Sequence, residues 1–166
     1  MSSLRKRAPK RLPAAELSDA AAERVAVGLL ARRDYAGGEL AAKLGERGFT
    51  APVVQTLIEE LRARGLLDDE RYAGHFVQYH LARGQGPMRI RRDLNAAGVA
   101  ATLIDAALAA VSDWAEIARQ VRRRRFGPKP PASWPEKGRQ ARFLQYRGFS
   151  TDHIRSALGP DFDPDS

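Results

Sequence analysis

Arginine is the side chain in this 166-residue sequence best placed to do chemistry, and arginines gather in the second half of the chain. A guanidinium group can hold a phosphate or a carboxylate through two parallel hydrogen bonds. One group lies within residues 83–92 and a second within residues 122–147. The candidate anion-binding residues are Arg83, Arg89, Arg91, Arg92, Arg122, Arg123, Arg124, Arg125, Lys129, Arg142 and Arg147.

The first group belongs to a segment that predicts a helix start. Pro87 suits the first turn of a helix. Ile90 and Leu94 lie four residues apart and should face the core, which turns the neighbouring arginines outward. These arginines could bind phosphates or carboxylates, or they could form a solvated helix face. A nucleotide-binding glycine loop fits poorly, because no strand precedes the segment and the Walker lysine is missing.

The second group contains four consecutive arginines, residues 122–125. Four consecutive positions sweep most of the circumference of a helix, so at least one should lie along the apolar seam. The others would form a positive edge beside a proline-rich segment. We favour a binding role for this edge over a merely solvated face.

Other functional side chains are sparse. His75 and His80 are five residues apart and have no acidic ligand at metal spacing, and no serine has a nucleophile-elbow context. We therefore expect no catalytic residue, no metal and no cofactor. Five aromatic residues could stack on bases, although helical spacing places Tyr72 and Trp114 in the core and Trp134 is expected in a loop. The five are Tyr35, Tyr72, Trp114, Trp134 and Tyr146.

A threefold repeat positions these residues. Segments 44–50, 94–100 and 144–150 align without gaps at a spacing of 50 residues. Each carries a glycine that should end a helix in the left-handed conformation, namely Gly48, Gly98 and Gly148. Thr50 and Ser150 should then cap the next helix through their hydroxyls, which Ala100 cannot do.

This pattern predicts an all-α fold of three tandem three-helix repeats in an elongated, curved array. The repeats should span residues 18–66, 67–111 and 112–158, with first helices near 18–33, 69–83 and 113–126. The third repeat should contain a proline-rich insertion at 127–135. Residues 1–17 should form a disordered basic arm, and residues 159–166 should fray.

Charge is distributed unevenly over these regions. The net charge is +8, with +5 in residues 1–15, −4 in 16–70, +10 in 71–158 and −3 in 159–166. This asymmetry favours a polyanionic partner, although a basic protein without such a partner is the alternative. The chain has no cysteine, no run apolar enough to span a membrane and no apolar region after its basic start. We therefore expect a cytoplasmic protein without membrane contact.

Five motifs in order resemble the RecX family, over about residues 22–158. No single motif is specific, but their order and spacing make a chance match improbable. They are residues 33–35 (RDY), 65–72 (GLLDDERY), 83–90 (RGQGPMRI), 124–127 (RRFG) and 142–150 (RFLQYRGFS).

The resemblance implies a bacterial, cytoplasmic, non-enzymatic protein of three three-helix repeats. It implies binding within the groove of the RecA–DNA filament and inhibition of its ATPase, strand exchange and co-protease activity. DNA binding has also been attributed to the family, so the expected partners are the RecA filament and single-stranded DNA, with double-stranded DNA as a further candidate. We expect a monomer. The alternative function is a helical protein that binds DNA directly and needs no recombinase.

One segment departs from the family pattern. After Arg33-Asp34-Tyr35 the family usually has a serine or threonine cap, whereas this chain has Ala36-Gly37-Gly38 before Glu39. Each glycine costs about 1 kcal/mol inside a helix. We therefore expect a looser start for the second helix of the first repeat.

Overall fold

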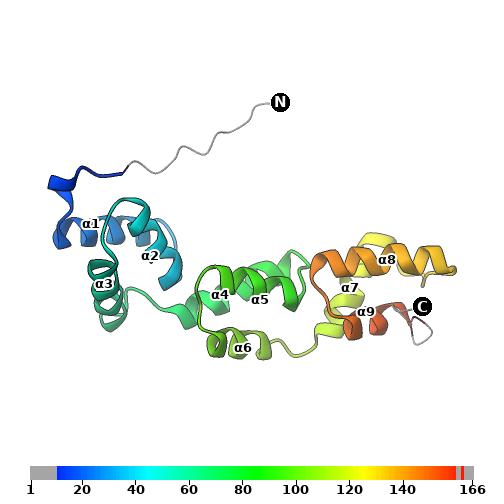
Figure 1. Cartoon of the computed structure of the whole chain (residues 1–166). Coiled ribbons are helices and arrows are strands. Elements are labelled where there is room, and N and C mark those ends of the chain that lie inside the picture. Colours follow the sequence, from blue (N-terminus) through cyan, green and yellow to red (C-terminus); the bar gives the residue numbers. More distant parts are fainter. Residues whose placement is uncertain (1–10, 160–161, 163–166) are drawn as a thin grey trace. The chain divides into compact units, whose positions relative to one another are not determined.

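The computed structural model describes residues 11–159 and residue 162. In this part of the chain all regular secondary structure is helical (Figure 1). After a short 3-10 helix, η1 (Ala14–Glu16), the α-helices are α1 (Asp19–Leu30), α2 (Gly37–Glu46), α3 (Ala51–Ala63), α4 (Asp69–Ala82), α5 (Pro87–Ala96), α6 (Ala101–Ala109), α7 (Trp114–Phe126), α8 (Trp134–Arg147) and α9 (Thr151–Leu158).

The chain divides into two compact units, Met1–Tyr72 and Ala73–Ser166, with the division inside α4. In the first unit, α1, α2 and α3 pack on one another. Leu40, Leu44 and Leu61 are fully buried at the centre of this packing. The helix α1 begins at a Ser18 cap, whose hydroxyl accepts a hydrogen bond from the Ala21 backbone N–H at 3.2 Å.

The start of α2 is capped from outside its own repeat segment. The Gly37 backbone N–H donates to an Asp69 carboxylate oxygen at 2.7 Å, and the other carboxylate oxygen pairs with Arg62 at 2.7 Å. A Cβ at position 37 would lie 2.4 Å from a guanidinium nitrogen of Arg62. The glycine therefore makes room for this ion pair, and Asp69 replaces the missing serine or threonine cap.

In the second unit, α5 packs on α6, and α7, α8 and α9 pack on one another. Leu144 and Phe149 are buried in the core of the α7–α9 set together with Ile154. In α5 and α6, the buried Ile90, Leu94 and Ile104 form the apolar face that the helical spacing predicted.

Close backbone contact joins α5 to the turn between α8 and α9. The Gly86 N–H donates to the Arg147 carbonyl at 2.8 Å, and the Met88 N–H donates to the Gly148 carbonyl at 3.0 Å. A Cβ on Gly86 would lie 2.4 Å from the Gly148 carbonyl carbon, and one on Gly148 would lie 2.4 Å from Arg89 Cβ. Both positions therefore require glycine.

The predicted helix stops are confirmed. The three stop glycines have positive φ angles of 106°, 79° and 92°, in the order Gly48, Gly98, Gly148. Ser150 caps α9 as predicted, in a capping box with His153, and Ala100 makes no side-chain cap. The prediction for Thr50 is wrong, because this residue precedes α3 without a side-chain cap hydrogen bond.

The predicted disordered arm, residues 1–17, is too long. Leu12 and Leu17 pack against the core of the first unit, and the Leu12 N–H donates to the Arg47 carbonyl at 3.0 Å. Residues 1–10 lie outside the described part of the chain. Apolar side chains explain the difference, since they give this basic segment something to bury.

Two further boundaries need correction. The predicted insertion at 127–135 ends earlier, because Trp134 and Pro135 occupy the first turn of α8, where proline is tolerated. Ser133 caps that helix. In the predicted frayed tail, 159–166, Phe162 is buried in the core of the α7–α9 set. The tail residues 160–161 and 163–166 lie outside the described part.

Candidate functional site

Ion pairs neutralise many of the cations of the first unit. Arg64 contacts Glu23 at 2.6 Å, and Lys43 contacts Glu46 at 3.1 Å. The hydrogen bonds that the Arg33 guanidinium donates to the Glu39 carboxylate raise the pKa of Arg33. The Arg62–Asp69 ion pair is a further contact of this kind. A cation that is already paired with a carboxylate of its own chain gains less by binding an anionic partner.

Four of the predicted site residues in the second unit are also paired. Arg91 contacts Asp105 at 2.6 Å, and Arg123 contacts Glu116 at 2.7 Å. Arg92 and Arg89 share one carboxylate: Asp93 lies 2.9 Å from Arg92 and 3.8 Å from Arg89. The hydrogen bond from Arg119 is the main reason that the pKa of Glu116 is lowered.

Arg122 is not available for binding. It is only 4% exposed, and its Nε donates to the Gln140 side-chain oxygen at 2.8 Å. A second guanidinium nitrogen donates to the Lys129 backbone carbonyl, and burial lowers the pKa of the guanidinium. Arg122 is thus the member of the arginine run that lies inward, and it holds the loop between α7 and α8. We remove it from the candidate anion-binding set.

The remaining six predicted residues have no carboxylate within 4.0 Å among the described residues. Four of them gather around a depression of about 220 Å³ formed by the end of α4, α7 and α8. Within the described part of the chain, no acidic side chain lines this depression. Its floor is apolar, with Val121 and Phe143 among the lining residues. The four arginines are Arg83, Arg124, Arg125 and Arg147, and the other two predicted residues are Lys129 and Arg142.

Aromatic rings and backbone contacts hold two of these arginines. The Arg83 guanidinium carbon lies 3.8 Å from the centre of the Tyr79 ring, and that of Arg147 lies 5.2 Å from the Phe143 ring. Arg147 also donates to the Arg83 carbonyl at 3.0 Å. Gly84, just after α4, allows close packing against α7, since a Cβ at this position would lie 3.0 Å from the Val121 side chain. The guanidinium groups are therefore positioned before any anion arrives.

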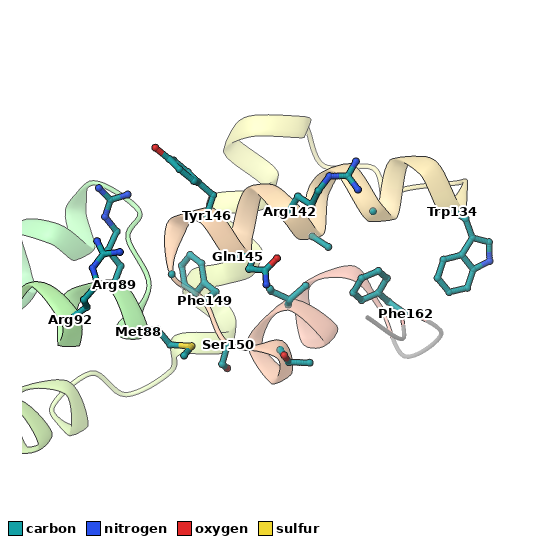
Figure 2. A pocket seen from close by; sticks show the side chains of 15 residues that line it. Met88, Arg89, Arg92, Trp134, Arg142, Gln145, Tyr146, Phe149, Ser150 and Phe162 are labelled. Carbon is teal, nitrogen blue, oxygen red and sulfur yellow. The ribbon is translucent and has the colours of Figure 1, made fainter. Parts of the chain in front are cut away.

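A larger groove of about 720 Å³ lies in the same unit (Figure 2). Arg89 and Arg92 from α5 stand at one side, and Arg142 and Tyr146 from α8 at another. Met88 completes the α5 side, and none of the described residues that line the groove is acidic. Sequence reasoning listed these arginines in two separate groups and gave no sign of the groove, which depends on packing between repeats.

The structure adds one aromatic residue that the sequence analysis did not single out. Tyr79 is 56% exposed and lies beneath Arg83. The four-residue spacing of Tyr79 and Arg83 is the signal that could have revealed this contact. Tyr35 is buried, and Trp114 packs partly buried against the core of the α7–α9 set and donates its indole N–H to the Leu108 carbonyl.

Comparisons with known proteins agree with this threefold helical architecture. Family models for the first, second and third three-helix domains of RecX match residues 22–61, 68–108 and 112–158. The chain belongs to the RecX family. The three models follow one another in order and match the helix sets α1–α3, α4–α6 and α7–α9, which confirms the predicted all-α fold of three-helix repeats.

Relatives in this family are named regulatory proteins. The Halorhodospira halophila protein "Regulatory protein RecX" is 48% identical over 133 residues, covering 80% of this chain and 83% of that protein. A Pseudomonas fluorescens relative of the same name is 41% identical over 139 residues, covering 83% and 90%.

Solved structures share the fold. "Crystal structure of RecX from Lactobacillus salivarius" superposes with a TM-score of 0.73 at 20% identity, covering 84% of this chain and 94% of that one. Within the described part of this chain, no helix combines the length and apolar character that crossing a bilayer requires.

Proposed function

We propose that this RecX-family chain binds the RecA–DNA filament through the cationic surface of its second unit. By this binding it inhibits the ATPase, strand exchange and co-protease activity of the filament. The observation that carries the proposal is the set of unpaired cations around the depression between α4, α7 and α8. Such groups repel one another and gain free energy when an anionic surface neutralises them.

Regulation of this kind requires no chemistry on the part of the chain. The protein acts as a binding module in the cytoplasm, without a cofactor and as a monomer. Its partners are RecA filaments and DNA, with single strands as the principal nucleic acid and duplexes as a further candidate. The regulatory names of the relatives support a non-enzymatic role.

The second candidate function is direct DNA binding without a recombinase. The same unpaired guanidiniums favour it, because they suit phosphates as well as carboxylates. Salt dependence separates the two functions. A phosphate-driven binder should prefer bare DNA and lose affinity steeply as salt rises, whereas a filament binder should prefer RecA-coated DNA.

The test compares two double variants that each remove two exposed arginines. Arg124→Gln with Arg125→Gln changes the depression. Arg24→Gln with Arg32→Gln is the matched control, because these two arginines of the first unit are exposed and have no carboxylate within 4.0 Å in the described chain. We expect the first variant to bind RecA-coated DNA at least about tenfold more weakly, which corresponds to about 1.4 kcal/mol, and the control to bind like the wild type.

Equal binding by the two variants would overturn the assignment of the surface. Preference of the wild type for bare DNA, with no inhibition of filament ATP hydrolysis, would overturn the filament function in favour of direct DNA binding. Circular dichroism and urea unfolding of both variants exclude a folding defect as the cause of any loss.

A further inference from the structure

The groove of Figure 2 carries exposed aromatic rings in addition to its positive charges, and charge attraction alone does not require such rings. Two exposed aromatic rings stand on its rim: Tyr146 is 77% exposed and Trp134 is 55% exposed. Large aromatic side chains are normally buried in monomers of this size, because their exposure forfeits apolar burial. Both rings have exposed surface against which a planar group can stack, and the Phe162 ring centre lies 6.3 Å from that of Trp134.

Each ring has a cation nearby. The Arg89 guanidinium carbon lies 5.8 Å from the centre of the Tyr146 ring, and Lys137 Nζ lies 5.3 Å from the Trp134 ring. Arg142 adds a further positive charge to the lining, and Arg92 adds a guanidinium that Asp93 contacts at 2.9 Å. A planar group stacked on either ring would therefore lie beside cations, which suits a nucleobase attached to phosphates.

Arg89 is incompletely satisfied within the chain. Its Nε is buried and has no hydrogen-bond partner among the described residues. The Asp93 carboxylate is 3.8 Å from that nitrogen, which is beyond hydrogen-bond distance. A buried donor without an acceptor costs free energy.

The interior of the groove combines an apolar floor with polar edges. Phe149 and Ile154 are buried beneath it, while Gln145, Ser150 and Thr151 supply an amide and two hydroxyls. Figure 2 shows Gln145 and Phe149 between the arginine side and the Trp134 side of the groove. Amides and hydroxyls of this kind can hydrogen-bond the edge of a base that lies on the apolar floor.

We infer that this groove holds an unpaired nucleobase together with its adjoining phosphates, and so gives the chain a preference for single-stranded over duplex DNA. The inference rests on the proposed function, in which DNA is a partner, and it names the element of DNA that is recognised. Duplex DNA cannot supply this ligand, since its bases are stacked on one another and paired. An acidic peptide could neutralise the arginines but would leave the two ring faces unused.

The experiment separates base recognition from phosphate recognition in the full-length protein. Labelled dT20 is compared with an abasic strand of the same length, which carries the same phosphates without bases. Stacking contributes about 1–3 kcal/mol per base, so we expect the wild type to bind dT20 at least about tenfold more tightly than the abasic strand. A 20-base-pair duplex should bind with the weaker, abasic-like affinity.

Tyr146→Leu and Trp134→Leu should each reduce the ratio of the two affinities towards one. Leu66→Ala is the control, because Leu66 is an apolar side chain of the first unit that is 42% exposed and does not line the groove. This variant should keep the full ratio. Tyr146 is the safer variant for folding, since most of its surface is already in water.

Equal binding of dT20 and the abasic strand by the wild type would overturn the inference. So would a ratio that survives both substitutions, or variants that lose binding to RecA-coated DNA while keeping the ratio, which would assign the groove to a protein partner. The proposed function fails separately, if the Arg124→Gln and Arg125→Gln variant still binds and inhibits the filament like the wild type.

Discussion

The two compact units use arginine in different ways. In the first unit, several arginines face carboxylates of the same chain, as in the pairs of Arg62 with Asp69 and Arg64 with Glu23, while Arg24 and Arg32 do not. In the second unit, Arg124 and Arg125 stand with other arginines around a depression whose described lining residues include no carboxylate. The difference lies in the clustering of unpaired arginines around one depression, which marks a binding surface more clearly than the number of charges does.

Packing sharpens this contrast. Guanidiniums that repel one another need a rigid support, and the second unit supplies it through the contact of α5 with the turn after α8. There Gly86 and Gly148 approach so closely that neither can carry a side chain. The unit therefore holds its unpaired charges in place, whereas the ion pairs of the first unit form part of its own stability.

Gly148→Ala should have the largest effect, because it breaks the support of the cationic surface. Its Cβ would lie 2.4 Å from Arg89 Cβ, in a backbone with φ of +92°. Left-handed strain and overpacking together should lower the free energy of unfolding by about 2–4 kcal/mol, measured in urea. Gly45→Ala is the control, because the space around that position is open. The free energy of unfolding of this variant should equal that of the wild type or exceed it by up to about 1 kcal/mol.

Arg122→Met should show that position in the fold, not charge, decides the role of an arginine. It leaves the Gln140 side-chain oxygen and the Lys129 carbonyl without their donor. We expect a loss of about 1–2 kcal/mol in stability and unchanged affinity for RecA-coated DNA. Arg124→Met should show the reverse pattern, and similar behaviour of the two variants would contradict the distinction.

Asp69→Ala tests the same contrast from the first unit. The carboxylate is 10% exposed, caps Gly37 and pairs with Arg62. Its removal should destabilise the protein by about 1–2 kcal/mol and leave filament binding intact. Glu23→Ala, which breaks the more exposed pair with Arg64, should cost less than about 1 kcal/mol. Reduced filament binding by Asp69→Ala, at a temperature where the variant is folded, would count against the division of roles.

The smallest expected effect concerns pH and α9. His153 Nδ1 accepts a hydrogen bond from the Ser150 N–H at 3.3 Å, and burial lowers the pKa of this histidine. The folded state therefore binds fewer protons than the unfolded state just below the unfolded pKa of about 6.5. Stability should be fully present above pH of about 6.5 and should decline as pH falls from there towards the folded pKa.

Replacement by glutamine isolates this contribution. The difference in unfolding free energy between wild type and His153→Gln should shrink as the pH is lowered from about 8 to about 5. A pH-independent difference in urea titrations would show that the histidine does not contribute through its protonation.

Sequence reasoning succeeded where the signal was local. A glycine that ends a helix can be recognised within a few residues, as at Gly148. It failed where the outcome depended on distant segments. Nothing near Arg122 indicates that Gln140 will bury it, and nothing near Gly37 indicates a cap from Asp69. The groove under Tyr146 likewise exists only because two repeats pack together.

The most direct test of the account is the rate of ATP hydrolysis by RecA on single-stranded DNA in the presence of three forms of this chain. The account predicts strong inhibition by the wild type and by Arg24→Gln with Arg32→Gln, and weak inhibition by Arg124→Gln with Arg125→Gln. Equal inhibition by the two double variants would contradict the claim that unpaired arginines of the second unit bind the filament.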